Sequence, residues 1–360
     1  MPQVQAEQRL FPPVSLEFMG EETLPRETFQ ETPIGGLSAI TYDRQKNCFY
    51  ALSDDRSQQA PARFYTLKIN ISPTDDKPVH IEKVTVENVT FLKDKLGQPY
   101  PRQTIDPEGI SLSPKGTIFI SSEGSPKRGI NPFLGEFDRV TGQLQQQVPL
   151  PQRYLLATEP EASPRGVEEN LGFEPLTISA TSILKDDPFR LFTAIEGSLK
   201  QDTSPTPPRQ IPLRLLHYVI STIGPPVIVA EHLYLLDETP KGAIANGLTE
   251  LLALPQEGSW LSLERTFGIN GFGAKLFQVV NSNASETSSI VSFQDGVEGI
   301  KPLRKKLLWD LQDLDIKLDN LEGMTLGPRL ADGSQTLILI SDDNFNSEQK
   351  TQLLLFQLKT

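Results

Sequence analysis

A motif that occurs five times constrains the fold of this chain more than any other feature. Each copy contains a glycine or proline, an apolar residue and a serine or threonine, and then two strand-like runs separated by a turn. One copy reads DPEGISLSPKGTIFISSEG, and the others begin at Gly35, Phe173, Asn246 and Leu321. Consecutive anchor residues lie 73, 66, 72 and 76 residues apart, at Gly36, Gly109, Pro175, Gly247 and Gly323. Repetition at such regular intervals predicts tandem units of one architecture.

Each unit is predicted to have about four antiparallel strands, as in a propeller blade, because two further strand-like runs follow the motif. In the first unit these runs are ARFYTLKINI and VHIEKVTVENVTFL. The fifth unit ends after its third strand, TQLLLFQLKT, and the N-terminal run VSLEFMGEETL can supply the fourth. We therefore predict an all-β protein, a five-bladed β-propeller whose ring is closed by the N-terminal strand. Six blades remain the alternative, since every interval exceeds the ~40 to 45 residues of a compact blade.

The composition agrees with this fold class. The 25 glycines and 30 prolines among 360 residues interrupt the chain too often for long helices. We expect residues 13–360 to form a single domain and residues 1–12 to be a flexible tail. The proline-rich run SLKQDTSPTPPRQIPL is predicted to be a surface loop.

The charge of the chain excludes some partners. A formal net charge of −12 and a pI near 4.9 argue against binding to nucleic acid or to anionic membranes.

No apolar run approaches the ~20 residues of a membrane span. The single cysteine, Cys48, excludes an intrachain disulfide and is expected to be a small buried residue. We expect a monomer.

Acidic residues recur where the first strand of a unit begins and where the second strand ends. In a blade these two strands are antiparallel neighbours, so both points lie at the same rim of the channel. The acids should therefore gather around one mouth of the channel. The predicted ring contains Asp54, Asp55, Glu108, Glu123, Glu174, Glu196, Glu264, Glu322, Asp342 and Asp343.

Carboxylates crowded into a partly desolvated mouth repel one another and favour a cation. A hard ion with oxygen ligands fits such a site, Ca²⁺ first and Mg²⁺ or Mn²⁺ as alternatives. The metal ligands we predict from the ring are Asp54, Glu108, Glu123, Glu174, Glu196, Glu264, Glu322 and Asp342. The nearby Arg102, Arg128 and Arg265 could neutralise acids or hold a phosphate, and the sequence does not choose between these roles.

A simpler interpretation competes with the metal site. Acids at strand ends can be ordinary solvated turn residues, and a glycine after the glutamate can serve close packing at a crowded axis. Recurrence at the same two places of the unit favours the ring, although inheritance by duplication weakens that argument. His80, His217 and His232 lie in predicted third or fourth strands, away from the mouth, so a Ser-His-Asp triad has no support. Trp260 and Trp309 are predicted to be core residues.

The same motifs resemble the phytase-like family described as "esterase-like activity of phytase". The resemblance rests on GGLSAITYD with ALSDD, DPEGISLSPKGTIFISSEG, GFEPLTISA with TAIEG, SLERTFG, and DNLEGMTLGP with LISDDNFN. It covers nearly the whole chain from Gly35 onward. It implies a propeller, hydrolysis of phosphate or carboxylate esters, a bacterial source and, because many members carry export signals, a periplasmic or extracellular location. The first residues lack the features of a secretory signal, so a cytoplasmic location is not excluded.

Two classes of function follow from these observations. The first is a metal-dependent hydrolase of a small anionic ester or phosphoester, in which Glu123 and Glu196 act at the reacting bond and Arg128 or Arg265 binds the anionic part. A calcium-dependent lactonase is a variant of this hypothesis. The second is a non-catalytic binding module in which the ring holds a structural ion or none. The sequence leaves open whether the protein is an enzyme.

Overall fold

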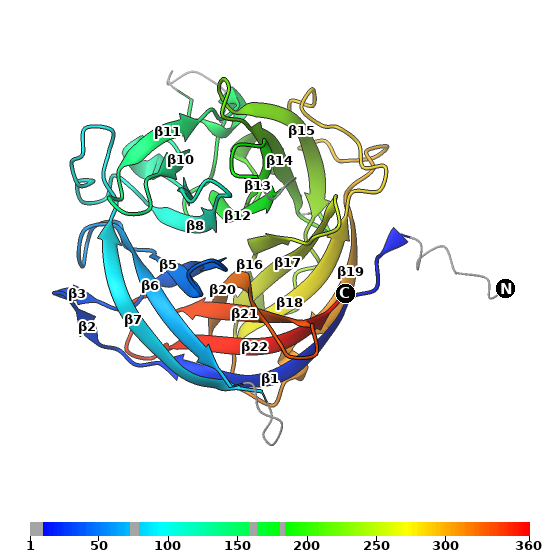
Figure 1. The fold of residues 1–360 in the computed structure, drawn as a ribbon. Helices are drawn as coiled ribbons and strands as arrows, with labels where there is room; N and C mark the ends of the chain where they lie inside the picture. The colour runs from blue at the N-terminus through cyan, green and yellow to red at the C-terminus, as the bar shows by residue number, and fades with distance from the viewer. Residues whose placement is uncertain (1–9, 73–78, 158–163, 181–183, 207) are drawn as a thin grey trace.

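Five four-stranded antiparallel sheets are arranged around a common centre (Figure 1). The computed structural model describes residues 10–72, 79–157, 164–180, 184–206 and 208–360. Each sheet is one blade of a β-propeller, which confirms the predicted all-β fold and the count of five blades. No helix in the described ranges is long and apolar enough to cross a membrane.

Blades 1 to 4 are each built from four consecutive strands, as the repeat predicts. Blade 1 contains β4 (Leu37–Asp43), β5 (Cys48–Ser53), β6 (Arg63–Ile71) and β7 (Ile81–Phe91). Blade 2 contains β8 (Pro107–Leu112), β9 (Ile118–Ser122), β10 (Phe133–Phe137) and β11 (Leu144–Val148). Blade 3 contains β12 (Phe173–Ala180), β13 (Phe189–Ile195), β14 (Pro212–Ile220) and β15 (Val227–Leu235). Blade 4 contains β16 (Ala243–Ala253), β17 (Ser259–Gly268), β18 (Gly271–Val280) and β19 (Arg304–Asp310).

Blade 5 joins the two ends of the chain. Its strands are β20 (Asn320–Arg329), β21 (Gln335–Asp342), β22 (Thr351–Lys359) and the N-terminal β1 (Ser15–Leu24). β1 pairs antiparallel with β22, and Figure 1 shows the two lying side by side. The N-terminal strand therefore closes the ring, as predicted. Of the expected tail at residues 1–12, residues 1–9 lie outside the described part of the chain.

The first strand of each blade lies at the centre of the ring. β4, β8, β12, β16 and β20 contact one another in sequence around it, and Figure 1 shows the last four of these close to the centre. Close packing here requires small residues. A Cβ on Gly109 of β8 would lie 2.3 Å from the carbonyl oxygen of Glu174 in the next blade. The glycine after Glu108 thus serves close packing, in addition to any role of its acidic neighbour.

The core lies between the faces of adjacent blades. The second strands of blades 1 and 2 are completely buried, because every residue of β5 and of β9 is buried. Removing one such large side chain, as in Phe49→Ala, costs about 3–5 kcal/mol. Trp260 packs in this core against Phe192, and the partly buried Trp309 packs against Phe356, which confirms both as core residues.

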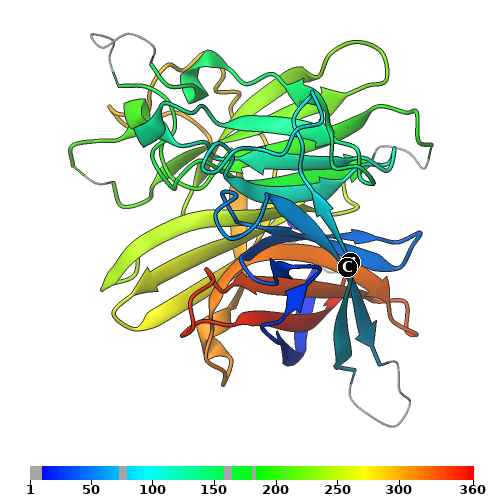
Figure 2. The same ribbon diagram turned by 90° about the vertical axis from the view of Figure 1, so that its left-hand side faces the viewer.

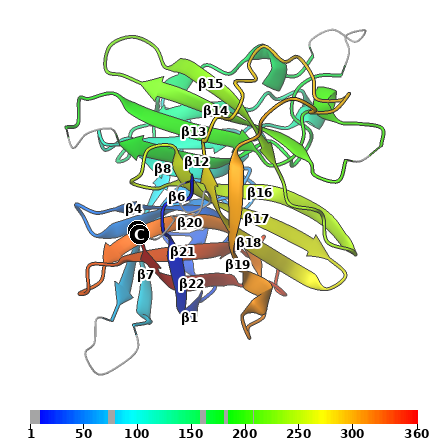
Figure 3. The ribbon, with the colours of Figure 1, turned by 90° about the vertical axis from the view of Figure 1, so that its right-hand side faces the viewer.

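Loops and hairpins extend from the ring at several places. A two-stranded hairpin of β2 (Thr28–Phe29) and β3 (Thr32–Pro33) links β1 to the first blade. Figures 2 and 3 show the hairpin of β6 and β7 projecting beyond the other blades. Cys48 is buried at the start of β5, as expected.

Candidate functional site

Acidic side chains from four blades meet at one mouth of the channel. Three of them, Glu108, Glu174 and Glu322, lie at irregularities in the pairing of the first strand with the second. Others stand at or just after the end of the second strand. We define the central carboxylate cluster as Asp54, Asp106, Glu108, Glu123, Glu174, Glu196, Glu322 and Asp342.

Two groups within the cluster have the spacing of cation ligands. Carboxylate oxygens of Asp54, Asp106 and Glu108 all lie within 4.8 Å of one another. The same holds for Glu123, Glu174 and Glu196. The sequence predicted five of these six residues. It missed Asp106, although this residue directly precedes β8 in the quoted motif.

Each of these two groups contains a buried carboxylate oxygen without a hydrogen-bond partner. The oxygens are Oδ2 of Asp106 and Oε2 of Glu174. The residue Asp106 itself is only 2% exposed. An unsatisfied buried oxygen is costly, and a bound cation or an ordered water is what normally satisfies it. The donor set, carboxylates alone, fits a hard ion such as Ca²⁺ or Mg²⁺.

Burial and mutual repulsion raise the pKa of several of these carboxyls. Burial, together with the charge of Asp54, raises the pKa of Asp106 to about 8. Burial raises the pKa of Glu108 well above its usual range, and Asp54 and Asp106 raise it further. The pKa of Glu123 and of Glu174 is raised for the same reasons. Burial likewise raises the pKa of Glu322, to about 7, although Arg265 opposes it.

Two guanidinium groups form ion pairs with the cluster. Arg265 donates from Nη2 to Glu196 Oε1 at 2.9 Å and lies 3.5 Å from Glu322 Oε1. Burial alone would lower the pKa of Arg265, but Glu196 and Glu322 outweigh it and raise the pKa. Arg56 pairs with Asp106, with 2.5 Å between Nε and Oδ1. Eight carboxyl groups thus face two guanidinium groups. Arg265 lies beside acids of blades 3 and 5, and the partly buried Arg56 lies beside acids of blades 1 and 2.

Glu264, predicted to belong to the ring, lies elsewhere. Its carboxylate accepts a hydrogen bond from the Tyr234 hydroxyl at 2.6 Å and also contacts Lys305 Nζ. In the pairing of β16 with β17, Leu248 faces Glu264 and Gly247 faces Arg265. Because successive side chains of a strand point to opposite faces, Arg265 projects into the cluster and Glu264 projects toward blade 3. Arg265 occupies the place where the other blades carry an acid.

Asp55 and Asp343 also lie apart from the cluster. Asp55 accepts hydrogen bonds from backbone N–H groups of Gln58 and Ala60 and pairs with the buried Arg63 at 2.7 Å. Asp343 accepts from Gly36 N at 2.8 Å and pairs with Arg26 at 3.1 Å. Both residues stabilise rim loops, so the second acid of each pair has a structural role.

The sequence also missed a buried acid beneath the mouth, Glu250 of β16. Its Oε1 accepts from Leu251 N at 2.9 Å and from Leu176 N at 3.2 Å, and the carboxylate also accepts from Met324 N. These donors lie on β12, β16 and β20. Burial raises the pKa of Glu250 well above its usual range, and the three N–H groups oppose the rise. The sequence pattern places the anchor residue of this unit at Gly247, three residues before Glu250. In the structure, Glu250 itself occupies the position that the anchor residues Gly109 and Pro175 occupy in blades 2 and 3.

Arg128 lies at the rim of a cavity beside the cluster. The cavity has a volume of about 420 Å³ and is lined by Arg56, Asp106, Lys127, Arg128 and Glu169, among others. Glu169 accepts from Lys127 N at 2.9 Å and so fixes the turn that carries Lys127 and Arg128. Both basic side chains are exposed. Within the described part of the chain, neither side chain forms an ion pair.

The histidines are remote from this site. His217 lies on β14 and His232 on β15, the third and fourth strands of blade 3, and His80 directly precedes β7. Burial lowers the pKa of His217 to about 4, helped by Arg190. Neither group of potential ligands described above contains a histidine. The site is therefore built from carboxylates and guanidinium groups.

The fold and the site define a five-bladed propeller with a carboxylate cluster at its mouth. The model of the Phytase-like family, described as "Esterase-like activity of phytase", matches residues 32–345, and the chain belongs to this family. A comparison with curated proteins found no match.

Several solved structures resemble the chain at low identity. An endo-arabinase from Bacteroides thetaiotaomicron is 12% identical, with 89% of this chain and 93% of that chain covered and a TM-score of 0.43. The catalytic domain of an α-L-arabinofuranosidase from Coprinopsis cinerea is 11% identical, with 97% of each chain covered and a TM-score of 0.41. The N-terminal domain of Nup159 is 10% identical, with 96% of each chain covered and a TM-score of 0.30.

Proposed function

We propose that this protein is a divalent-cation-dependent hydrolase of small anionic esters or phosphoesters. The observation that carries the proposal is the unpartnered Oδ2 of Asp106, in a group of three close carboxylates next to a cavity with two unpaired basic side chains. The family description, esterase-like activity, agrees with this class of reaction. Ca²⁺ is the first choice of ion, because clustered carboxylates without nitrogen or sulfur ligands suit it.

Asp54, Asp106 and Glu108 would hold the ion, which when bound would polarise the ester and lower the pKa of a water molecule. Lys127 and Arg128, at the rim of the cavity, would attract and orient the anionic part of the substrate. This assigns to Arg128 the anion-binding role and to Arg265 the neutralising role that the sequence left open.

Glu123 is suited to proton transfer. Its Oε1 accepts from Gly172 N at 2.5 Å, which leaves Oε2 for a proton, and burial raises the pKa of its carboxyl well above the usual range, which favours the protonated form. Glu196 is tied to Arg265, so its role would be to hold that guanidinium within the cluster. Arg265 thereby favours ionised carboxylates in blades 3 and 5 without any metal.

A binding module without catalysis is the second candidate. Arg265 favours this candidate, because its guanidinium group offsets the repulsion between the clustered carboxylates without a metal ion. The module would have the same mouth but no ion with an open coordination position.

We propose a periplasmic or extracellular location, where calcium is abundant enough to fill sites of modest affinity. The prediction of a small substrate in place of a polyanion agrees with the net charge of −12, which would slow the approach of a highly charged ligand.

Calcium titration calorimetry on chelator-stripped protein tests the proposal. We expect one ion to bind, and Asp106→Asn or Glu108→Gln to weaken binding by at least about tenfold, because affinity follows the number of charged ligands. Glu123→Gln tests whether the second group of carboxylates, Glu123, Glu174 and Glu196, contributes to calcium binding. The matched control is Glu348→Gln, an exposed acid on the same rim, which should bind calcium like the unmodified protein. The variants that bind calcium more weakly should also hydrolyse p-nitrophenyl phosphate or p-nitrophenyl acetate more slowly in the presence of calcium, and Glu348→Gln should hydrolyse them like the unmodified protein. Absence of any divalent-ion binding would rule out the mechanism.

A further inference from the structure

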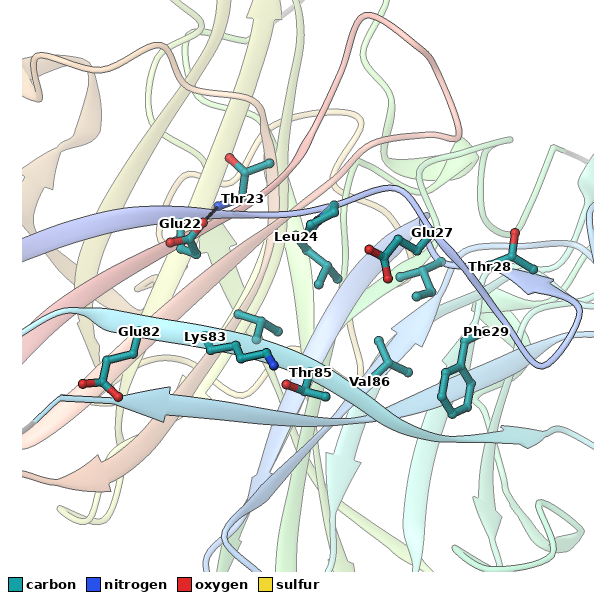
Figure 4. A pocket seen from close by; sticks show the side chains of 13 residues that line it. Glu22, Thr23, Leu24, Glu27, Thr28, Phe29, Glu82, Lys83, Thr85 and Val86 are labelled. Carbon is teal, nitrogen blue, oxygen red and sulfur yellow. Dashed lines mark hydrogen bonds between the residues drawn. The ribbon is translucent and has the colours of Figure 1, made fainter.

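A groove separates the outermost strands of blades 5 and 1, and none of its lining residues belongs to the carboxylate cluster. It lies between β1 and β7 and is closed at one end by the β2–β3 hairpin (Figure 4). Its volume is about 460 Å³, within the range of ligand-binding pockets. The groove lies where the two ends of the chain close the ring, so its two walls come from residues that are distant in the sequence.

The floor of the groove is apolar. Leu24 and Ile34, which are 5% and 7% exposed, belong to the core beneath it. Phe29, Val84 and Val86 are partly buried against the same core and line the groove. Figure 4 shows Leu24 of β1 directed toward β7. An apolar side chain of a ligand would therefore remove apolar surface from water here.

The rim of the groove is acidic. Glu22, Glu27 and Glu82 line it, against a single basic lining residue, Lys83. In the described part of the chain no ion pair neutralises these three acids. Arg26, next to Glu27, turns away and pairs with Asp343 at 3.1 Å. The rim thus offers uncompensated negative charge to a ligand with basic side chains.

The chain itself covers the outer strands of two other blades with extended segments. Against β15, Thr287 N donates to Glu231 O at 2.8 Å and Leu303 N to Leu233 O at 2.8 Å. Beside β11, Lys93 N donates to Gly142 O at 2.8 Å and Leu144 N to Lys93 O at 2.9 Å. In the described residues, β7 pairs with β6 and β1 with β22, and neither has a partner on its other edge. An edge strand presents unpaired backbone groups that can accept another strand.

We propose that this groove binds an extended peptide segment of a partner protein, in which apolar and basic side chains alternate, by addition of the segment to the edge of β7. Apolar side chains of the peptide contact Leu24, Val84 and Val86, and basic ones lie against Glu27 and Glu82. The alternation follows from the period of two in a strand. The proposal does not depend on the hydrolase activity.

The test uses fluorescence polarisation with a capped peptide of about six residues that alternates valine and lysine, a length that matches the part of β7 lining the groove. We expect saturable binding to the full chain, and no binding of the valine–glutamate peptide. Glu27→Lys with Glu82→Lys should weaken binding at least tenfold. The matched control is Glu87→Lys on the same strand, exposed and outside the groove, which should bind like the unmodified protein.

A second peptide separates strand addition from simple charge attraction. Methylation of alternate backbone nitrogens removes hydrogen-bond donors and leaves the charge unchanged, so the methylated peptide should bind at least tenfold more weakly. Equal binding of the methylated peptide, an equal effect of the double variant (Glu27→Lys with Glu82→Lys) and of Glu87→Lys, or no binding of the valine–lysine peptide would each overturn the proposal.

Discussion

Arg265 donates a hydrogen bond to Glu196 at 2.9 Å across the junction between blades 4 and 3. It occupies the position at which blades 1, 2, 3 and 5 carry Asp54, Glu123, Glu196 and Asp342. A Cβ on Gly247, opposite Arg265 on β16, would lie 2.1 Å from Glu196 Oε1. The fourth repeat therefore carries a base where the other four repeats carry an acid, and Gly247 leaves room for the ion pair of Arg265 with Glu196.

Replacing Arg265 should be strongly destabilising. Arg265→Met keeps much of the side-chain volume but leaves Glu196 and Glu322 without a counter-charge. Removal of one partner from a buried ion pair costs about 3–5 kcal/mol, so the free energy of unfolding in urea should fall by this amount at neutral pH. Arg128→Gln, at an exposed position, should change it by less than about 0.5 kcal/mol. Equal stability of the two variants would show that Arg265 does not neutralise the cluster.

Glu250 should stabilise the ring through the three strands that it joins. Glu250→Ala leaves the N–H groups of Leu176, Leu251 and Met324 without this acceptor, and we expect a loss of about 2–4 kcal/mol in the free energy of unfolding. Glu250→Gln retains an acceptor oxygen and should lose less. Equilibrium unfolding in urea measures both variants, and a larger loss for Gln than for Ala would contradict this role.

The fold could be predicted because it depends on a repeated pattern. The motifs place the first two strands of every blade, and the missing fourth strand of the last unit indicates closure by β1. Clustering of acids followed from antiparallel pairing alone, because the start of one strand and the end of the next share a rim.

Details of the site could not be predicted because they depend on register. A shift of one residue on β17 exchanges Glu264 for Arg265 at the centre, and the sequence contains no signal for that shift. The apolar run in which Glu250 lies gives no indication that backbone donors from three blades meet there. Arg56 was missed because it pairs with Asp106, 50 residues away in the sequence.

Stability of the metal-free protein should decrease as the pH rises above neutrality. The pKa of Asp106 is about 8 in the folded state, well above the ordinary value of 3.8, so the folded state binds more protons than the unfolded state between these values. The favourable contribution of Asp106 to the free energy of unfolding is complete below about pH 4 and is lost as the pH rises through 8. Glu322, with a pKa of about 7, acts in the same direction.

The measurement is urea unfolding in chelator between about pH 7 and about pH 8.5. His217 does not interfere in this range, because its pKa is lowered to about 4 from 6.5 and its contribution changes only between these values. Asp106→Asn should flatten the pH dependence, and added calcium should also flatten it if the ion binds there. A stability that rises with pH in chelator would contradict the raised pKa of the cluster.

Lys127 and Arg128 should determine the preference for an anionic substrate. Lys127→Gln with Arg128→Gln removes two exposed charges from the cavity that Asp106 also lines. Each exposed charge contributes about 0.2–1 kcal/mol, so the KM for p-nitrophenyl phosphate should rise by about 2- to 30-fold with little change in kcat. The KM for the neutral p-nitrophenyl acetate should stay constant.

Lys306→Gln, at an exposed lysine on β19, is the matched control and should change neither KM value. High salt should reduce the difference between the variant and the unmodified protein, since it screens exposed charges. Equal losses toward both esters would show that the two basic residues support the local structure and do not select the charge of the substrate.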